Sequence, residues 1–436
     1  MFAERRQRFL KAMDPDSVAI LLGNPTVPRS RDTEYPFRQD SDFWYLSGFD
    51  HPNAVAVLRN YGSEPYTLFV EPRDKELETW TGYRPGVEGA LADYEADAAH
   101  PRSEFIEKLP DLIRGARQVY HVLGRDAQLD TRLTETVEAL RLRSRVESAP
   151  PDRIVDPRSL THAMRLLKEA GEVEIMRRAA AISHEAHRAA AGIAWTGAHE
   201  YELQAVLEYN FRKLGASGPA YTSIVGGGAN ATILHYVRND QSLHENDLVL
   251  IDAGCELEGY ASDVTRTYPV DGRFAGPARE LYEVVLAAQE ASLAEARPGS
   301  TLPAVHEASV RTLTEGLVAL GLLEGDVEEL VARDAFRSFY MHGTSHWLGL
   351  DVHDVGSYRG QTGPRILEPN MAFTVEPGLY VASDAELSDE RFRGIGIRIE
   401  DDVVITADGH ENLNADLPKR PDDVAALVRE RPVAAR

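Results

Sequence analysis

Four acidic residues stand at the ends of strongly apolar segments in the C-terminal part of the chain. Asp252 closes DLVLID, Glu376 follows AFTV and Glu400 follows GIGIRI, while Asp263 lies eleven residues after Asp252 in a strand-like segment. An unpaired charge beside buried apolar residues is costly, and carboxylates that converge repel one another. The pattern therefore predicts a fold that brings these segments together around a bound cation.

The segment FYMHGTSHWLGLDVHDVG, residues 339–356, adds three histidines: His342, His346 and His353. Apolar residues alternate along the chain between the last two histidines. This alternation predicts a short strand with His346 and His353 at its two ends.

Five of these side chains form a candidate ligand set: Asp252, Asp263, His346, Glu376 and Glu400. Five ligands exceed what one ion needs from a protein, and they suffice for two ions with bridging carboxylates. Oxygen-rich ligation with one imidazole favours manganese or a similar divalent ion over a structural zinc, although cobalt, iron and zinc also accept such ligands. Two ions lower the pKa of a bridging water and polarise a carbonyl, which is the chemistry of amide hydrolysis.

Two domains are predicted. Residues 1–159 alternate strand-like runs such as SVAILLG with helical stretches, which indicates an α/β domain that ends in the Pro-rich linker SAPPDRIVDPRS, residues 148–159. Residues 160–436 predict an α+β domain, because helices over 163–192 and 197–216, and again over 278–299 and 300–321, each precede strands. This order suggests an internal duplication, and the tail after residue 414 is predicted to be peripheral.

Four local features receive structural interpretations. The motif SHEAHR, residues 183–188, has its histidines one residue too close for the zincin motif and is predicted to be a solvated helix face. The glycines 226–228 lack the residues of a phosphate loop and are expected to turn the backbone. Cys255 is expected to be a small buried apolar residue, and Gly396 to leave room for a ligand.

Composition restricts location and partners. A single cysteine among 436 residues cannot form an intramolecular disulfide, and MFAERRQRFL has charges where a signal peptide has its apolar core, so we expect a cytoplasmic protein. A formal charge of −23 repels nucleic acid and anionic lipid. The apolar runs are too short for a membrane span. Neither nucleic acid nor a membrane is therefore an expected partner.

The motif HGTSHWLGLDVHD resembles the signature of the aminopeptidase P and prolidase group of pita-bread metallopeptidases. The segments IDAGCELEGYASDVTRTY, FTVEPGLY and GIGIRIEDDV resemble the family's other ligand segments in the same order, and FRQDSDFWYLSGF resembles the N-terminal domain of bacterial members. The resemblance runs from about residue 8 to residue 413. It implies a pita-bread catalytic domain in which the five candidate ligands hold a metal pair.

The resemblance also implies roles for residues near the metals. Glu376 would relay a proton while a bridging hydroxide attacks the carbonyl, and His235 and His353 would steady the tetrahedral intermediate. His342 is a further implied active-site histidine, and with Tyr380 and Arg398 it would also line or border the substrate recess. The implied activity is release of an N-terminal residue that precedes proline, whose tertiary amide needs a dedicated site.

Two alternatives share these features. A prolidase would act on dipeptides alone, but FRQDSDFWYLSGF and Trp80 favour admission of a longer chain. Trp80 matches a tryptophan that a neighbouring subunit uses to narrow the active site, so the resemblance implies a homodimer or homotetramer. A non-catalytic binding protein on the same fold is the remote alternative, because relatives of that kind have lost ligand carboxylates that all remain here.

Overall fold

The computed structural model describes residues 1–144, 149–274, 276–387 and 389–430, and the chain divides into two compact units, Met1–Met164 and Arg165–Arg436. No helix in these described ranges combines the length and the apolar character that crossing a bilayer requires.

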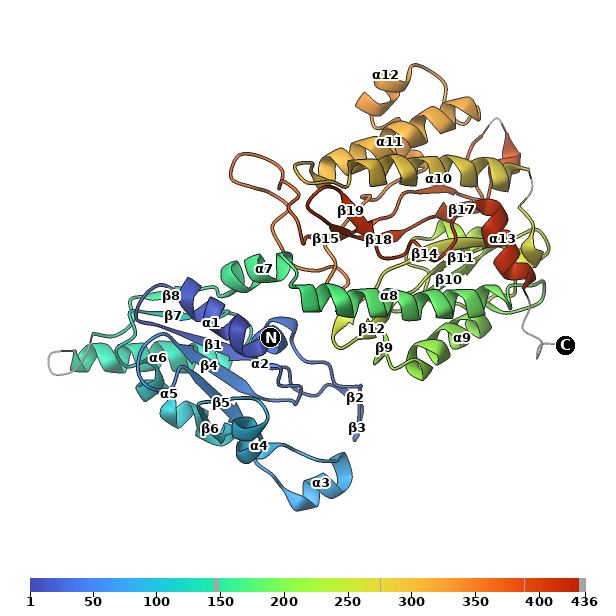
Figure 1. Cartoon of the computed structure of the whole chain (residues 1–436). Helices are drawn as coiled ribbons and strands as arrows, with labels where there is room; N and C mark the ends of the chain where they lie inside the picture. The colour runs from blue at the N-terminus through green and yellow to red at the C-terminus, as the bar shows by residue number, and fades with distance from the viewer. Residues whose placement is uncertain (145–148, 275, 388, 431–436) are drawn as a thin grey trace. The chain divides into compact units, whose positions relative to one another are not determined.

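The N-terminal unit is built on a mixed six-stranded sheet with the order β6-β5-β4-β1-β7-β8 (Figure 1). Its strands are β1 Ser17–Leu22, β4 Val55–Arg59, β5 Tyr66–Val70, β6 Ala98–Pro101, β7 Gln118–Tyr120 and β8 Arg153–Val155, and a hairpin of β2 Pro28–Ser30 and β3 Thr33–Glu34 lies apart. Strand β4 is antiparallel to both of its neighbours, whereas β1, β7 and β8 run parallel. Part of the predicted linker is thus a strand of this sheet, while residue 148 lies outside the described ranges.

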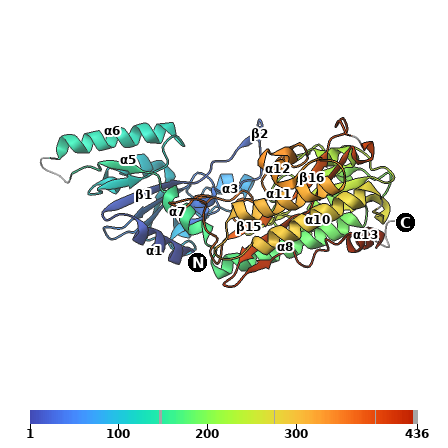
Figure 2. The same cartoon turned by 90° about the horizontal axis from the view of Figure 1, so that it is seen from above.

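Helices cover both faces of this sheet, which explains why β1 is buried along its whole length. Figure 2 shows α5 and α6 on one side of β1 and α1 on the other. The helices are α1 Phe2–Ala12, α2 Ser41–Ser47, α3 Lys75–Thr81, α4 Gly86–Ala92, α5 Phe105–Ile113 and α6 Ala127–Arg143. The α/β architecture predicted for this part of the chain is confirmed.

The second unit repeats one order twice: a pair of helices, followed in the second repeat by a third, short helix, and then short antiparallel strands. Helices α8 Ala170–Ala191 and α9 Glu200–Lys213 precede β9 Gly218–Pro219, β10 Ile224–Gly227, β11 Leu248–Asp252, β12 Cys255–Leu257, β13 Tyr260–Ala261 and β14 Thr265–Pro269. Helices α10 Pro277–Glu295, α11 Leu302–Ala319 and α12 Val327–Ala332 precede β15 Ala372–Val375, β16 Gly378–Val381, β17 Ile395–Arg398, β18 Asp401–Ile405 and β19 His410–Asn412. The predicted α+β class is confirmed.

The helix pairs cover the strands (Figure 1). Leu281 and Val285 of α10 and Leu313 of α11 pack against Leu250 of β11 and Ile397 of β17 in one buried cluster. Burial of a side chain such as leucine contributes about 1.5–3 kcal/mol. The strands that end in carboxylates are therefore stabilised by apolar contacts with helices α10 and α11.

The helix predicted over residues 163–192 is broken in two, as α7 Arg158–Leu166 and α8. The Lys168 backbone N–H donates to the carbonyl of Asn370 at 2.8 Å, which takes the chain out of the helix. Glu169 then starts α8 through a capping box with Glu172. The apolar periodicity carries no sign of this break, because the partner at Asn370 is distant in sequence.

The strand predicted between His346 and His353 is wrong, because residues 349–353 form bends and no strand is found over 346–353. Only an isolated bridge joins Trp347 to Phe373, and the Asp354 N–H turns back to the Trp347 carbonyl at 2.8 Å. The carboxylate of Asp354 is buried against Lys168 Nζ at 3.0 Å, and this contact draws the backbone out of an extended path.

Two further predictions are also wrong. The histidines of SHEAHR are buried, not solvated: His187 Nε2 lies 2.9 Å from the Ala253 carbonyl, and His184 Nε2 lies 3.2 Å from the Asn414 amide. The C-terminal tail is not peripheral, because α13 Pro421–Arg429 buries apolar residues and Arg266 donates to the Leu417 carbonyl at 3.0 Å. Cys255 is buried, as predicted.

Candidate metal and catalytic site

The five candidate ligands line one cavity of about 420 Å³ in the second unit. Asp252 ends β11, Asp263 precedes β14, Glu376 follows β15 and Glu400 lies between β17 and β18. Strands β11 and β14 are antiparallel, with Asp252 opposite Thr265, so the predicted approach of Asp252 and Asp263 is observed. The cavity is also lined by Tyr221, Thr222, Ile224, Leu234, His235, Val237, His342, Gly343, Ser345, His346, Val352, His353 and Arg398.

Tyr221 ties the two aspartates together. Its hydroxyl lies 2.6 Å from Asp252 Oδ1 and 2.5 Å from Asp263 Oδ1. Burial and the two carboxylates raise the pKa of the Tyr221 phenol well above its usual value, so it remains a hydrogen-bond donor. Sequence reasoning missed Tyr221, because nothing in GPAYTSIV marks the tyrosine as a partner of residues more than thirty positions away.

His346 presents one ring nitrogen to the carboxylates. Its Nδ1 lies 3.0 Å from the Trp347 carbonyl and can only donate there, so the lone pair of the neutral ring, the form that binds a metal, lies on Nε2. Nε2 lies 3.4 Å from Asp263 Oδ2 and 3.6 Å from Glu376 Oε1. One ligand atom each from Asp263, His346 and Glu400 fall within 4.8 Å of one another, as a metal site requires.

The electrostatics of the cavity call for a cation. Burial and the neighbouring carboxylates raise the pKa of Glu400 well above its usual value, and burial raises the pKa of Asp252 despite Arg398. Burial likewise raises the pKa of Glu376 to about 7. Burial opposes a charged His346, but Asp263 and Glu376 outweigh it and raise its pKa to about 9. Without metal, bound protons therefore offset the negative charge of the carboxylates. A divalent cation would offset the same charge, and the carboxylate oxygens and the imidazole nitrogen are suitable ligands for it.

The carboxylates are anchored from behind. Thr265 Oγ1 donates to Glu400 Oε2 at 2.6 Å, and the Asp263 backbone N–H donates to Asp402 Oδ2 at 2.9 Å. Such outer contacts fix the direction of a ligand before any ion arrives.

Arg398, Tyr380 and His342 form one chain of hydrogen bonds. Arg398 donates to Asp252 Oδ2 at 2.6 Å and to the Tyr380 hydroxyl at 2.9 Å. The Tyr380 hydroxyl lies 2.8 Å from His342 Nε2, whose Nδ1 lies 2.8 Å from the Gly343 carbonyl. Because arginine only donates, the hydroxyl proton must point to Nε2 and the His342 proton must lie on Nδ1. Burial and Arg398 lower the pKa of His342 to about 3, so the ring is neutral.

These three residues meet the cavity differently. Arg398 and His342 line it, whereas Tyr380 is fully buried behind them and is not among the lining residues. His235 and His353 are exposed and line the cavity, and the His353 ring centroid lies 4.4 Å from that of His346. The structure therefore brings His235, His342, His353 and Arg398 to the carboxylates.

Gly396 does not leave room for a ligand as predicted. A Cβ atom there would lie 2.1 Å from the Ala231 carbonyl oxygen, which belongs to the short helix η2, Gly228–Thr232. The glycine instead allows η2 to press against β17.

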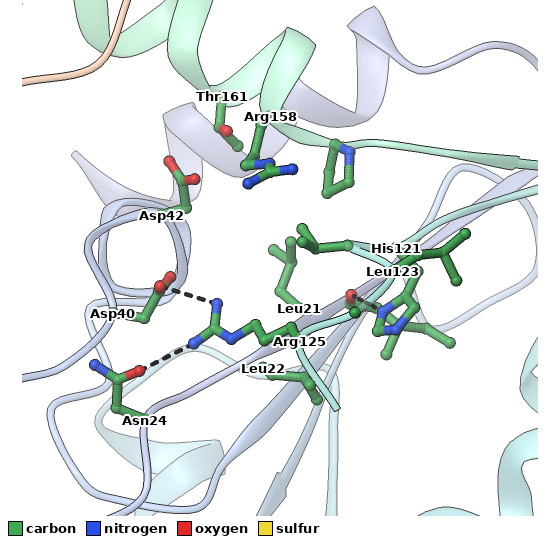
Figure 3. Close-up of a pocket in the computed structure, with 14 residues that line it drawn as sticks. Leu21, Leu22, Asn24, Asp40, Asp42, His121, Leu123, Arg125, Arg158 and Thr161 are labelled. Carbon is green, nitrogen blue, oxygen red and sulfur yellow. Dashed lines mark hydrogen bonds and ion pairs between the residues drawn. The ribbon is translucent and has the colours of Figure 1, made fainter. Parts of the chain in front are cut away.

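A second cavity, of about 520 Å³, lies in the N-terminal unit beyond the ends of β1 and β7. Figure 3 shows its principal cation, Arg125, directed at Asp40 and Asn24, which it reaches at 2.9 and 3.0 Å. His121 is paired with Asp130 at 3.0 Å. This cavity is larger, but its charged groups are already matched, and among the described residues no metal-ligating set converges there. The cavity with the carboxylates is therefore the candidate site.

Comparison with known proteins agrees with this choice. Residues 174–407 match the model of metallopeptidase family M24, and residues 2–120 match that of the aminopeptidase P N-terminal domain. The Xaa-Pro aminopeptidase of Escherichia coli (strain K12) is 47% identical over 100% of this chain and 98% of its own length. Human Xaa-Pro aminopeptidase 3 is 35% identical, over 95% of this chain and 81% of that protein.

Solved structures extend the likeness. Aminopeptidase PepP of Pseudomonas aeruginosa superimposes with a TM-score of 0.96 at 48% identity, covering 98% of this chain and 97% of that chain. A zinc-substituted E. coli aminopeptidase P in complex with product gives a TM-score of 0.94 at 47% identity, with the same coverage. The N-terminal likeness and the pita-bread fold of the second unit agree with the resemblance noted from the motifs. This chain therefore belongs to metallopeptidase family M24, and within that family to the Xaa-Pro aminopeptidases.

Proposed function

We propose that this metallopeptidase works with two divalent ions, preferably manganese, held by Asp252, Asp263, His346, Glu376 and Glu400. The convergence of these five side chains in one cavity carries the proposal. Their oxygen-rich donor set suits manganese, with cobalt, iron or zinc as substitutes. Bound ions of this kind lower the pKa of water and polarise a carbonyl.

Glu376 is the proposed proton carrier. It accepts the proton of the attacking water and passes it to the proline nitrogen, which leaves as an amine. Its carboxyl group lines the cavity together with the other four ligands, within reach of a water that the ions would hold.

His235 and His353 are proposed to donate hydrogen bonds to the substrate oxygens as charge develops on them. Both rings line the cavity from exposed positions and can meet a peptide there. Burial lowers the pKa of His353, and a neutral imidazole still keeps one N–H to donate.

The chain from Arg398 through Tyr380 to His342 is proposed to shape the recess for proline. It holds the His342 ring in one orientation beside the apolar residues Ile224, Leu234 and Val352 of the cavity. A pyrrolidine ring has no N–H to offer, so shape and apolar contact must recognise it. Tyr380 does not line the cavity, so its proposed role is to hold His342 and Arg398 in place.

The substrates are proposed to be peptides of three or more residues with proline in second place. Turnover of Xaa-Pro-Yaa peptides, Xaa-Pro dipeptides and Xaa-Ala-Yaa peptides, with manganese supplied, tests this proposal. We expect cleavage of the first class and little of the third. Cleavage of dipeptides alone would identify a prolidase, and full activity after thorough chelation would refute the metal mechanism.

We further propose that the chain forms a homodimer or homotetramer. The support is the exposed indole of Trp80, 85% accessible, on a helix that buries none of its own residues.

A further inference from the structure

Glu200, the first residue of α9, is a fully buried carboxylate outside the ligand set. It accepts four hydrogen bonds, all from the segment 227–241. Oε1 accepts from the Gly227 N–H at 2.7 Å and the Asn230 amide at 2.9 Å. Oε2 accepts from the Tyr236 hydroxyl at 2.8 Å and the Gln241 N–H at 2.9 Å. These neutral donors and the amino end of α9 offset its charge.

The segment that Glu200 holds carries His235. This histidine lies next to Tyr236 and lines the cavity. In the described part of the chain no hydrogen bond holds the His235 ring itself. The place of the ring is therefore set by the path of its backbone, which Glu200 fixes on both sides.

Two further contacts leave this segment little freedom. Helix η2 is pressed against Gly396 of β17, as described above. At the far end the Asn239 amide donates to the Ser223 carbonyl and to Gln204 Oε1, each at 2.9 Å. Two residues of helix α9, Glu200 and Gln204, thus accept hydrogen bonds from this segment and hold it in place.

We propose that Glu200 is a positioning residue that sets the place of His235 in the active site. The proposal rests on the role given to His235 above. Glu200 is not among the residues that line the cavity, and the four donors to its carboxylate all belong to the segment 227–241, so its effect would pass through the backbone of that segment. Loss of its hydrogen bonds should slow the reaction without changing metal content.

The first test is Glu200→Gln. An amide has one acceptor oxygen, and its NH₂ group must face either the Gly227 or the Gln241 N–H, which are backbone donors that cannot reverse. One of these two backbone hydrogen bonds is therefore lost. We expect kcat/KM to fall about tenfold with unchanged metal stoichiometry. Glu245→Gln, at an exposed carboxylate just beyond the segment, is the matched control and should retain full activity.

The decisive test repeats Glu200→Gln in a His235→Ala background. If Glu200 acts through His235, Glu200→Gln should leave kcat/KM about unchanged when it is added to the His235→Ala variant. An equal loss in both backgrounds, a loss of bound metal, or full activity of Glu200→Gln would overturn the inference while leaving the proposed function intact. Full activity of His235→Ala would instead remove the role proposed for His235, and the inference with it.

If Glu200→Gln does not fold, Tyr236→Phe serves in the same cycle, because it removes one of the four donors and keeps the buried ring. We expect a smaller loss, about threefold, that also vanishes in the His235→Ala background. An unchanged loss in that background would overturn the inference.

Discussion

The carboxyl group of Glu376 lies between two imidazoles. Oε2 is 3.6 Å from His342 Nδ1, and Oε1 is 3.6 Å from His346 Nε2. This position, inside the cavity and between two rings, suits the proton-carrier role proposed for Glu376.

Glu376→Gln keeps the size of this side chain but cannot exchange a proton. We expect kcat to fall by about 10²–10⁴ for an Xaa-Pro-Yaa tripeptide. Steady-state kinetics with parallel metal analysis measures the loss, and Asp384→Asn at an exposed site controls for a change of charge. A variant within threefold of the parent would contradict the proton-carrier role.

Tyr221→Phe tests the bridge between the aspartates. Removing the hydroxyl frees Asp252 and Asp263 to move apart, while the ring stays in place. We expect metal affinity to fall about 10–100-fold, the usual effect of losing an outer partner of a ligand. Calorimetric titration with manganese measures it, and Tyr209→Phe, at a tyrosine 62% exposed, is the control. Equal affinities in both variants would contradict the bridge.

At this scale the ligands could be predicted and their partners could not. A carboxylate at the end of a buried strand is conspicuous, because burial makes its charge costly, and Asp252, Glu376 and Glu400 all stand out in this way. Tyr221 is an ordinary residue in its segment. Its importance arises only because β11 and β14 pair and bring both aspartates to it.

Elements whose pattern reflects their own burial were predicted well. Helices α10 and α11 and the strands before Asp252 and Glu376 have such patterns. The strand expected near His353 failed because Asp354 is drawn to Lys168, far away in sequence. The burial of His187 was not predicted either, because its partner, the Ala253 carbonyl, is also distant in sequence. Local periodicity records burial but does not record distant polar partners.

The contact of β17 with η2 gives a prediction for an element. In Gly396→Ala the new methyl group would collide with the Ala231 carbonyl and push η2, and the segment with His235, away from the cavity. We expect a loss of about 1–3 kcal/mol in the free energy of unfolding, together with reduced kcat/KM. Gly409→Ala, where a Cβ meets nothing within 4 Å, is the control. Denaturation and kinetics that match the control would contradict the contact.

For the whole molecule, metal and pH act on stability together. Without metal the pKa of Glu376 in the folded chain is about 7, above its ordinary 4.5. A raised carboxyl pKa contributes stability that is present below the ordinary value and is lost as pH rises through 7. His346, raised to about 9, acts in the same direction at higher pH. Divalent ions replace these protons, so metal should matter most above neutral pH.

We therefore expect the rise in Tm on adding manganese to chelated protein to be at least about twofold larger near pH 8 than near pH 5. Differential scanning calorimetry of paired samples measures it. The buried His184 and His187, whose pKa values burial lowers to about 4 and 3, destabilise the fold in acid, but they affect both samples alike. An equal rise at both pH values would contradict this account of the cavity.

Helix α3 has no residue buried within this chain, and Leu77, Trp80 and Tyr83 on or beside it expose large apolar groups. A helix of seven residues is marginal without packing, so a second copy of the chain that covers this face would account for it. We expect Trp80→Glu to lower the oligomeric state seen by light scattering at micromolar concentration. Leu142→Glu, at a leucine equally exposed on α6, should leave that state unchanged. A monomeric parent with full activity would refute the oligomer, whereas a monomeric Trp80→Glu variant that has also lost activity would indicate that the neighbouring copy completes the active site.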